Sequence, residues 1–173
     1  MNTKRLTYLA MFVALGVLIP QVFHSAGGPL VGSILLPMHI PVLVGAIILG
    51  SRDGAIIGVI SVTVGALLGM PIMPMALFMF FELLTYGIVA GYIYSKKNNS
   101  FLALFGAMFT GRIVSLSVML ICINVIGMKL PPIFGTIAFF STGISGMIGQ
   151  IILVTTLVAL LRRDNLEFIK NTV

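Results

Sequence analysis

Six apolar stretches make up almost the whole chain, and short polar, glycine-containing or proline-containing joints separate them. They cover residues 6–23, 35–50, 54–70, 74–94, 101–126 and 133–161. A helix needs about 20 apolar residues to cross the hydrocarbon core of a bilayer, so the second and third stretches are short and the last is long. The pattern predicts an all-α integral membrane protein with six transmembrane helices, in one domain over residues 1–173.

The joints between these stretches contain helix breakers or charges, which predict loops there. They lie at residues 27–29, 50–54, 70–74, 96–99 and 129–132. The residues before the first stretch, Met1–Arg5, form a short basic leader that is also compatible with a signal peptide. Cleavage of such a peptide would leave an odd number of spans, so we expect the first stretch to remain as a helix.

Lysine and arginine are distributed unevenly between the two predicted sides of the membrane. With six crossings, eight of the ten fall on the side of both termini, and the opposite loops hold only Lys129. Cytoplasmic loops carry the excess of positive charge, so both termini are predicted to be cytoplasmic. The remaining cation, Arg112, lies inside an apolar stretch and has no such topological explanation.

Composition agrees with a membrane protein. The chain is 59% hydrophobic and 8% charged, with a mean hydropathy of +1.18, whereas soluble domains have about 25% charged residues. The topology accounts for the net charge of +6, and no basic stripe with interleaved aromatic residues indicates a nucleic-acid partner. The single cysteine, Cys122, excludes a disulfide framework, and we expect it to be a small buried side chain.

Two opposite charges inside apolar stretches mark the best candidate site. Arg112 lies near the middle of the fifth stretch, and Glu82 is the only acid in any of the six. A charge at the bilayer centre costs about 2.5–3.5 kcal/mol on insertion scales, so such residues usually face the interior of a bundle. Glu82 lies about 12 Å from the outer end of its stretch. The two charges either form a structural ion pair or bind a polar ligand in an outward-facing chamber.

Four further polar residues could line the same chamber. Tyr86 lies one turn after Glu82 on the same helix face. His39 is flanked by two prolines, which suggest a bent or partly unwound start of the second helix. Asn124 lies near the outer end of the fifth stretch and Gln150 in the middle of the sixth. Each of these two could bind a ligand or only bond a neighbouring helix.

Glycines at helical spacing predict close helix packing. The sets are Gly54 and Gly58, Gly65 and Gly69, Gly87 and Gly91, and Gly143, Gly146 and Gly149. Small residues four apart let helix backbones approach closely. The lysine and the strand-to-helix context of a phosphate-binding loop are missing from these motifs, so the chain itself is not expected to bind ATP.

Catalytic and metal chemistry find little support in the sequence. It has no Ser/His/Asp set, no His-x-x-x-His pair and no acidic cluster for magnesium, so no catalytic residue, metal site or cofactor is predicted. The methionines of residues 70–79 suit a flexible apolar lining better than a copper site. Binding or transport is the stronger class. The alternatives are a small intramembrane enzyme with Glu82 and His39 as acid and base, and a structural membrane subunit without a ligand.

The sequence resembles the substrate-binding S components of energy-coupling factor (ECF) vitamin transporters over essentially its whole length. The resemblance rests on the length, the six predicted spans and three local stretches. These are LAMFVA at residues 9–14, LPMHIPVL at 36–43 followed by Gly50 and Gly54, and FELLTYG at 81–87. It implies that Ala10 and Ala14, a small-x-x-x-small pair on the first helix, dock on the coupling transmembrane subunit.

The resemblance also implies a mechanism and partners. The chain would be a multi-pass protein of the bacterial plasma membrane that captures a vitamin from outside, beneath loops at residues 23–34 and 70–74. It would work with a coupling transmembrane subunit and two ATPase subunits, and would topple in the bilayer to release the substrate inward. Arg112 suits a carboxylate, as in pantothenate or niacin, and Glu82 suits an amine or ring N–H, as in a queuosine precursor. A flat heterocycle of the riboflavin class also stays open.

Overall fold

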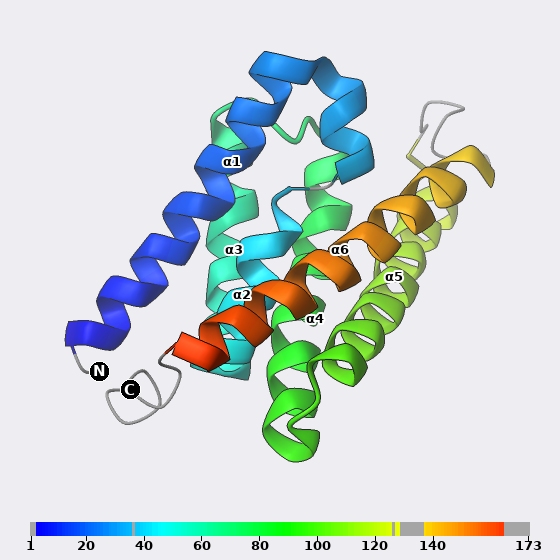
Figure 1. Cartoon of the computed structure of the whole chain (residues 1–173). Helices are drawn as coiled ribbons and strands as arrows, with labels where there is room; N and C mark the ends of the chain where they lie inside the picture. Colours follow the sequence, from blue (N-terminus) through cyan, green and yellow to red (C-terminus); the bar gives the residue numbers. More distant parts are fainter. Residues whose placement is uncertain (1–2, 36, 126, 129–136, 165–173) are drawn as a thin grey trace.

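The computed structural model of the chain describes residues 3–35, 37–125, 127–128 and 137–164. Within these ranges the chain forms helices and no strand, so the predicted all-α class is confirmed (Figure 1). The helices are α1 Thr3–Leu35, α2 His39–Leu49, α3 Ser51–Leu67, α4 Met75–Lys97, α5 Ser100–Asn124 and α6 Ile137–Asp164. Among the described residues, three segments are long and apolar enough to cross a membrane: Thr3–Phe23 of α1, α4 and α5. Six crossings remain a prediction.

The first helix is longer than its apolar stretch indicates. α1 does not end near residue 23 but continues to Leu35, so the predicted loop at residues 23–34 is wrong. Figure 1 shows that this last part of α1 bends across one end of the bundle. Glycine and proline are the usual causes of a sharp bend, and the breakers at residues 27–29 lie within this part of the helix. They mark a bent helix rather than a joint.

The second helix is shorter than predicted. α2 has 11 residues and is about 16 Å long, well below the thickness of the hydrocarbon core. α3 begins immediately after Gly50, whose φ of 97° is in the left-handed region that favours glycine. The predicted joint at residues 50–54 therefore shrinks to one residue. The joint at 70–74 is present between α3 and α4, and the one at 129–132 lies outside the described residues.

Two asparagines reverse the chain between α4 and α5. Asn98 ends α4 in the left-handed conformation with a φ of 49°, which asparagine tolerates better than most residues. The side chain of Asn99 accepts a hydrogen bond of 3.1 Å from the backbone N–H of Leu102 and so caps α5. This short turn keeps α4 and α5 antiparallel and side by side.

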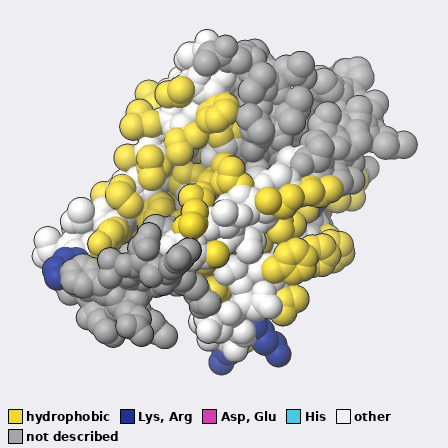
Figure 2. Space-filling view, viewed as in Figure 1, with side chains coloured by type: hydrophobic (Ala, Val, Ile, Leu, Met, Phe, Trp, Pro, Cys, Tyr) yellow, Lys and Arg dark blue, Asp and Glu magenta, His cyan; other side chains and the backbone are white. Residues whose placement is uncertain are grey.

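Positive side chains of the described residues lie at one end of the bundle. α1 begins and α6 ends at the same end, where the α4–α5 turn also lies (Figure 1). The Lys and Arg side chains visible in Figure 2 gather at this end, and apolar side chains cover the surface along α1. This distribution is the one that the predicted cytoplasmic termini require.

Glycines hold α3 and α4 in backbone contact. A Cβ atom at Gly87 would overlap the backbone of Gly54 and Ala55, and one at Gly58 would lie 2.7 Å from the carbonyl oxygen of Leu83. The predicted packing role of these glycines is confirmed. Gly149 on α6 has nothing within 4 Å of such a Cβ, so its predicted packing role is wrong.

A methyl group at Gly87 tests the α3–α4 contact. We expect Gly87→Ala to lower the free energy of unfolding by about 1–3 kcal/mol, because the two backbones must separate. The measurement is thermal or denaturant unfolding of the chain in detergent. Gly149→Ala is the matched control, and it should leave stability unchanged or raise it slightly because alanine favours helix. Equal stability of the two variants would contradict the contact.

Candidate functional site

The Glu82 carboxylate is the meeting point of polar groups from three helices. The Tyr86 hydroxyl donates a hydrogen bond of 2.8 Å to Glu82 Oε1. Arg112 Nη1 lies 3.5 Å and His39 Nε2 lies 3.9 Å from the same oxygen. Glu82, Tyr86 and His39 are buried, and the Arg112 side chain is 17% exposed. The structure therefore brings together four of the six residues that the sequence proposed for substrate binding. We name these four residues the polar cluster.

Local sequence features place these side chains. Glu82 and Tyr86 are four residues apart and so project from the same face of α4. His39 is the first residue of α2, and its ring lies 5.3 Å from that of Tyr86, centre to centre, at a tilt of 55°. The prolines on either side of His39 agree with its place at the start of a helix, because proline is tolerated in the first turn.

Gly111 is the residue of the site that the sequence analysis missed. A Cβ atom there would overlap the Tyr86 ring and would lie 3.2 Å from the backbone oxygen of Glu82. Only a glycine lets α5 come this close to α4, and the next residue, Arg112, thereby reaches the carboxylate. The signal in the sequence was the glycine directly before the one charged residue of that stretch.

The ion pair leaves part of the guanidinium unused. Charge-assisted N–H···O bonds are usually about 2.7–2.9 Å long, so the 3.5 Å between Arg112 Nη1 and Glu82 Oε1 is a loose contact. Arg112 Nη2 is buried and has no hydrogen-bond partner among the described residues. A buried donor without a partner costs about 1–3 kcal/mol. Arg112 therefore retains a donor that an acceptor group of a ligand would satisfy.

The other two proposed binding residues, Asn124 and Gln150, are on α5 and α6. Asn124 is exposed, and its side-chain amide donates a hydrogen bond of 2.9 Å to the backbone oxygen of Leu120 on its own helix. It is twelve residues, or about 18 Å, along α5 from Arg112. Gln150 is buried on the face of α6 that also carries Val154, a residue of the main core. Asn124 is therefore too far along α5 to join the polar cluster, whereas Gln150 is buried in the bundle on α6.

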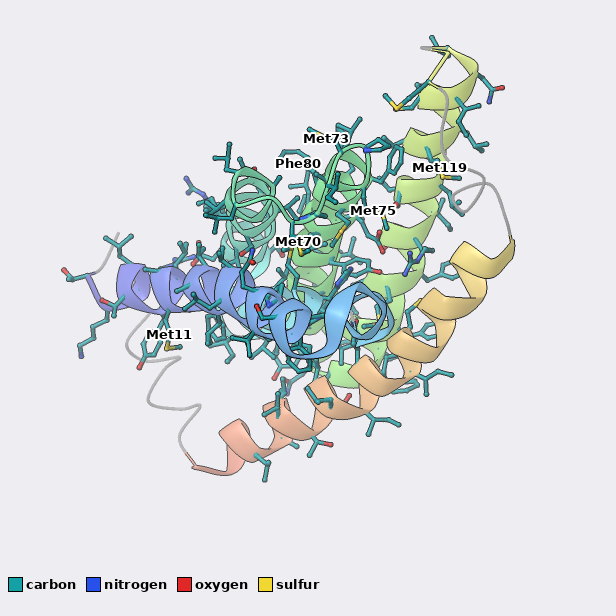
Figure 3. All side chains as sticks on the ribbon, turned by 90° about the horizontal axis from the view of Figure 1, so that it is seen from above. Met11, Met70, Met73, Met75, Phe80 and Met119 are labelled. Atoms are coloured by element: carbon teal, nitrogen blue, oxygen red, sulfur yellow. The ribbon has the colours of Figure 1, made fainter. Side chains whose placement is uncertain are left out.

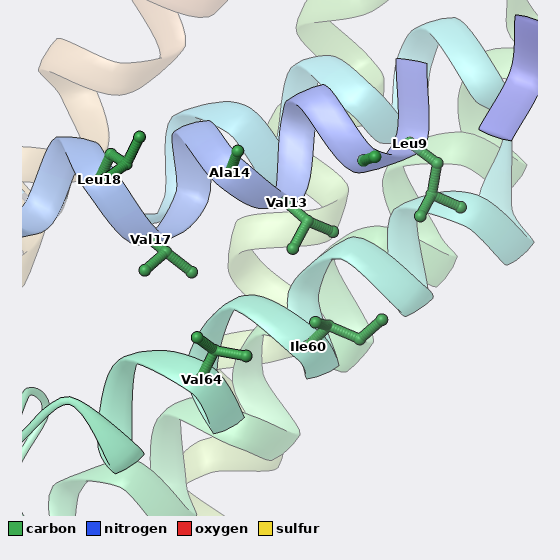
Figure 4. A pocket seen from close by; sticks show the side chains of 8 residues that line it. Leu9, Val13, Ala14, Val17, Leu18, Ile60 and Val64 are labelled. Atoms are coloured by element: carbon green, nitrogen blue, oxygen red, sulfur yellow. The ribbon is translucent and has the colours of Figure 1, made fainter. Parts of the chain in front are cut away.

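An apolar groove runs between α1 and α3. Its volume is about 520 Å³, and it contains Ala10 and Ala14, the two residues predicted to dock on a partner; both are exposed. Figure 4 shows Val13 and Val17 directed from α1 toward the side on which Ile60 and Val64 extend from α3. The full lining is Leu9, Ala10, Val13, Ala14, Val17, Leu18, Ile60 and Val64. We call this feature the α1–α3 groove.

A second apolar pocket lies where α3 connects to α4. It has a volume of about 430 Å³, and Ala66, Pro71, Met73 and Phe80 are among its lining residues. In the view from above, Met70 and Met75 lie toward the middle of the bundle, whereas Met11 points away from it (Figure 3). Among the described residues, no three His, Cys, Asp or Glu side chains are grouped as a metal site.

The helices and the buried polar cluster define the class of a helical membrane protein with charged groups between its helices. A family model described as "ECF transporter, substrate-specific component" matches residues 4–158, and the chain belongs to this family. It is thus a substrate-specific transporter subunit that works with partners of an ECF module, rather than an enzyme in itself. No curated protein and no solved structure matches the chain.

A double-mutant cycle tests the coupling of the two charges. We expect Glu82→Gln and Arg112→Gln each to lower stability, because each leaves the other charge without its counterion. The double variant should lose less than the sum, with an interaction energy of about 0.5–3 kcal/mol in unfolding experiments. Asn124→Ala combined with Arg112→Gln is the control and should be additive. Additive losses in the Glu82 and Arg112 pair would show that these charges do not interact.

Proposed function

We propose that the chain captures a small water-soluble vitamin or precursor that carries a carboxylate, of the pantothenate or niacin type, and delivers it for import. The ligand carboxylate binds Arg112, and Glu82, His39 and Tyr86 hold the guanidinium in place. The observation that carries this proposal is the buried Arg112 Nη2, which has no hydrogen-bond partner among the described residues.

The geometry favours an anionic over a cationic ligand group. Glu82 Oε1 already has three polar groups around it, whereas the guanidinium retains a buried donor. A guanidinium presents paired N–H groups that match the two oxygens of a carboxylate. Before the ligand binds, Glu82 supplies the countercharge that lowers the free-energy cost of placing Arg112 inside the bundle. The ligand carboxylate approaches from the side away from Glu82, because two carboxylates repel each other.

The depth of the cluster supports loading from the end opposite the termini. Glu82 is seven residues, or about 10 Å, from the start of α4. α4 starts at the end of the bundle over which α1 bends, and the α3–α4 connection lies there too (Figure 1). These two segments are in the right place to cover a ligand. In a bacterial plasma membrane with cytoplasmic termini and six crossings, this end faces outward.

The α1–α3 groove suits the docking of a partner helix. Ala10 and Ala14 add little bulk to its exposed face, and small residues allow the close backbone approach on which helix association in membranes depends. We propose that the coupling transmembrane subunit, with its two ATPase subunits, docks here. The docked chain topples in the bilayer and releases the substrate inward while the ATPase subunits hydrolyse ATP.

Ligand-induced stabilisation of the purified chain tests the substrate class. A carboxylate vitamin at about 100 times its Kd should raise the free energy of unfolding by about 2.7 kcal/mol, measured as a thermal shift. The shift should vanish in Arg112→Gln and persist in Lys96→Gln, which removes a cation from the opposite end of α4. Pantothenate, niacin, riboflavin and a queuosine precursor form the set. A shift only with the amine-bearing precursor, or one that survives Arg112→Gln, would contradict the proposal.

Added bulk in the groove tests docking. The double variant Ala10→Leu/Ala14→Leu should associate with the coupling complex at least about tenfold more weakly, a loss of about 1.4 kcal/mol, because leucine keeps the partner backbone away. Association is measured with purified components in nanodiscs. Leu15→Phe adds bulk to an exposed α1 residue outside the groove and should leave association unchanged. Normal association of Ala10→Leu/Ala14→Leu would contradict docking at this surface.

A further inference from the structure

A polar contact holds the beginning of α1 on the beginning of α3. Arg5 Nε donates a hydrogen bond of 2.5 Å to Asp53 Oδ2, and an Arg5 Nη2 group lies 3.5 Å from the backbone oxygen of Leu49. The Asp53 side chain is 2% exposed, against 30% for Arg5. Asp53 is in the first turn of α3, where the helix dipole favours an acid. This pair, of which the acid is buried, connects three helices at their ends.

The rest of the α1–α3 contact is apolar and close. Phe12 of α1 meets α2 and α3 at Gly45, where an added Cβ would lie 2.5 Å from Ile57 Cδ1 and 3.4 Å from Phe12 Cγ. Farther along, a Cβ at Gly16 would overlap the Ser61 side chain. The successive contacts of α1 with α3 thus run from the ion pair to a glycine crossing, and the α1–α3 groove lies beside them.

Apolar contacts between membrane helices do not strongly fix how the helices are oriented, because lipid tails are as apolar as the side chains that they would replace. The glycine crossing at Gly16 sets how near the two helices come, but it does not by itself fix the angle between them. A hydrogen bond between charged groups is directional, so the Arg5–Asp53 pair restricts the angle of α1 against α3. The pair lies eleven residues along α1 from the crossing at Gly16. At that distance it restricts a change of the α1–α3 angle more than a contact close to the crossing would.

We propose that Arg5 and Asp53 are positioning residues for docking. Their ion pair fixes the start of α1 on α3 and thereby holds the α1–α3 groove in the shape that the coupling subunit recognises. Arg5 is one turn before Leu9 and Asp53 is two turns before Ile60, and both Leu9 and Ile60 line the groove. The inference rests on the proposed docking of the coupling subunit at this groove.

The test variant removes the pair without leaving a buried charge. Arg5→Gln/Asp53→Asn is made in the full chain and compared with wild type for association with the coupling complex in nanodiscs and for ligand affinity. We expect association to weaken about tenfold, a typical size for coupling between two sites, while ligand affinity and folding stay unchanged. Arg52→Gln is the control, because it removes an exposed cation next to Asp53 and should have no effect.

A covalent link separates positioning from direct contact with the partner. Cysteines are introduced by Arg5→Cys and Asp53→Cys in a Cys122→Ala background, and a short bifunctional thiol reagent joins them. The unlinked protein should dock weakly and the linked protein should regain wild-type association. Failure of the linked protein to dock would overturn the proposal, since Arg5 or Asp53 would then act on the partner directly.

The remaining outcomes are equally decisive. Wild-type association of Arg5→Gln/Asp53→Asn would overturn the positioning role, and so would a parallel loss of docking and ligand affinity, which indicates a merely structural pair. Normal docking of Ala10→Leu/Ala14→Leu would instead overturn the docking surface itself. The two failures are therefore distinguishable.

Discussion

A carboxylate buried between apolar helices must find its partners within the protein, since lipid offers none. Glu82 has partners on three helices: Tyr86 on its own helix α4, His39 at the start of α2 and Arg112 on α5. This requirement fixes the register of α4 against α5 and the position at which the short helix α2 begins. Position 111 requires glycine because the Tyr86 ring lies directly against the α5 backbone there and leaves no space for a Cβ atom.

The helix α3 links this cluster to the proposed docking surface by direct contacts. Gly54 touches the backbone at Gly87, which follows Tyr86, and the residue before Gly54 is Asp53, the partner of Arg5. Consecutive residues of α3 thus contact α4 on one side and α1 on the other. A shift of α4 near the polar cluster would be passed directly to α3, because the two backbones are in contact at these glycines.

Much of the architecture could be predicted from the sequence, because apolar length and charge pattern respond directly to the bilayer. The helical class and the proximity of Glu82 and Arg112 came from such signals, and the glycine spacing indicated close packing without showing that α3 and α4 are the partners. Other features depend on tertiary neighbours. Hydropathy cannot show whether an apolar helix such as α2 is surrounded by lipid or by protein. Asp53 stands in a stretch with the composition of a loop, and only the position of Arg5 on another helix makes its burial favourable.

The short helix α2 has a consequence for how the protein enters its membrane. Its 11 residues are buried almost without exception, and it contacts α1, α3, α4 and α6. A segment of about 16 Å is too short to partition into a bilayer as a span of its own. α2 therefore depends on contacts with the surrounding helices to stay within the membrane. We therefore expect α2 to reach its final position only when the helices that bury it, α3 and α4 among them, are also in place.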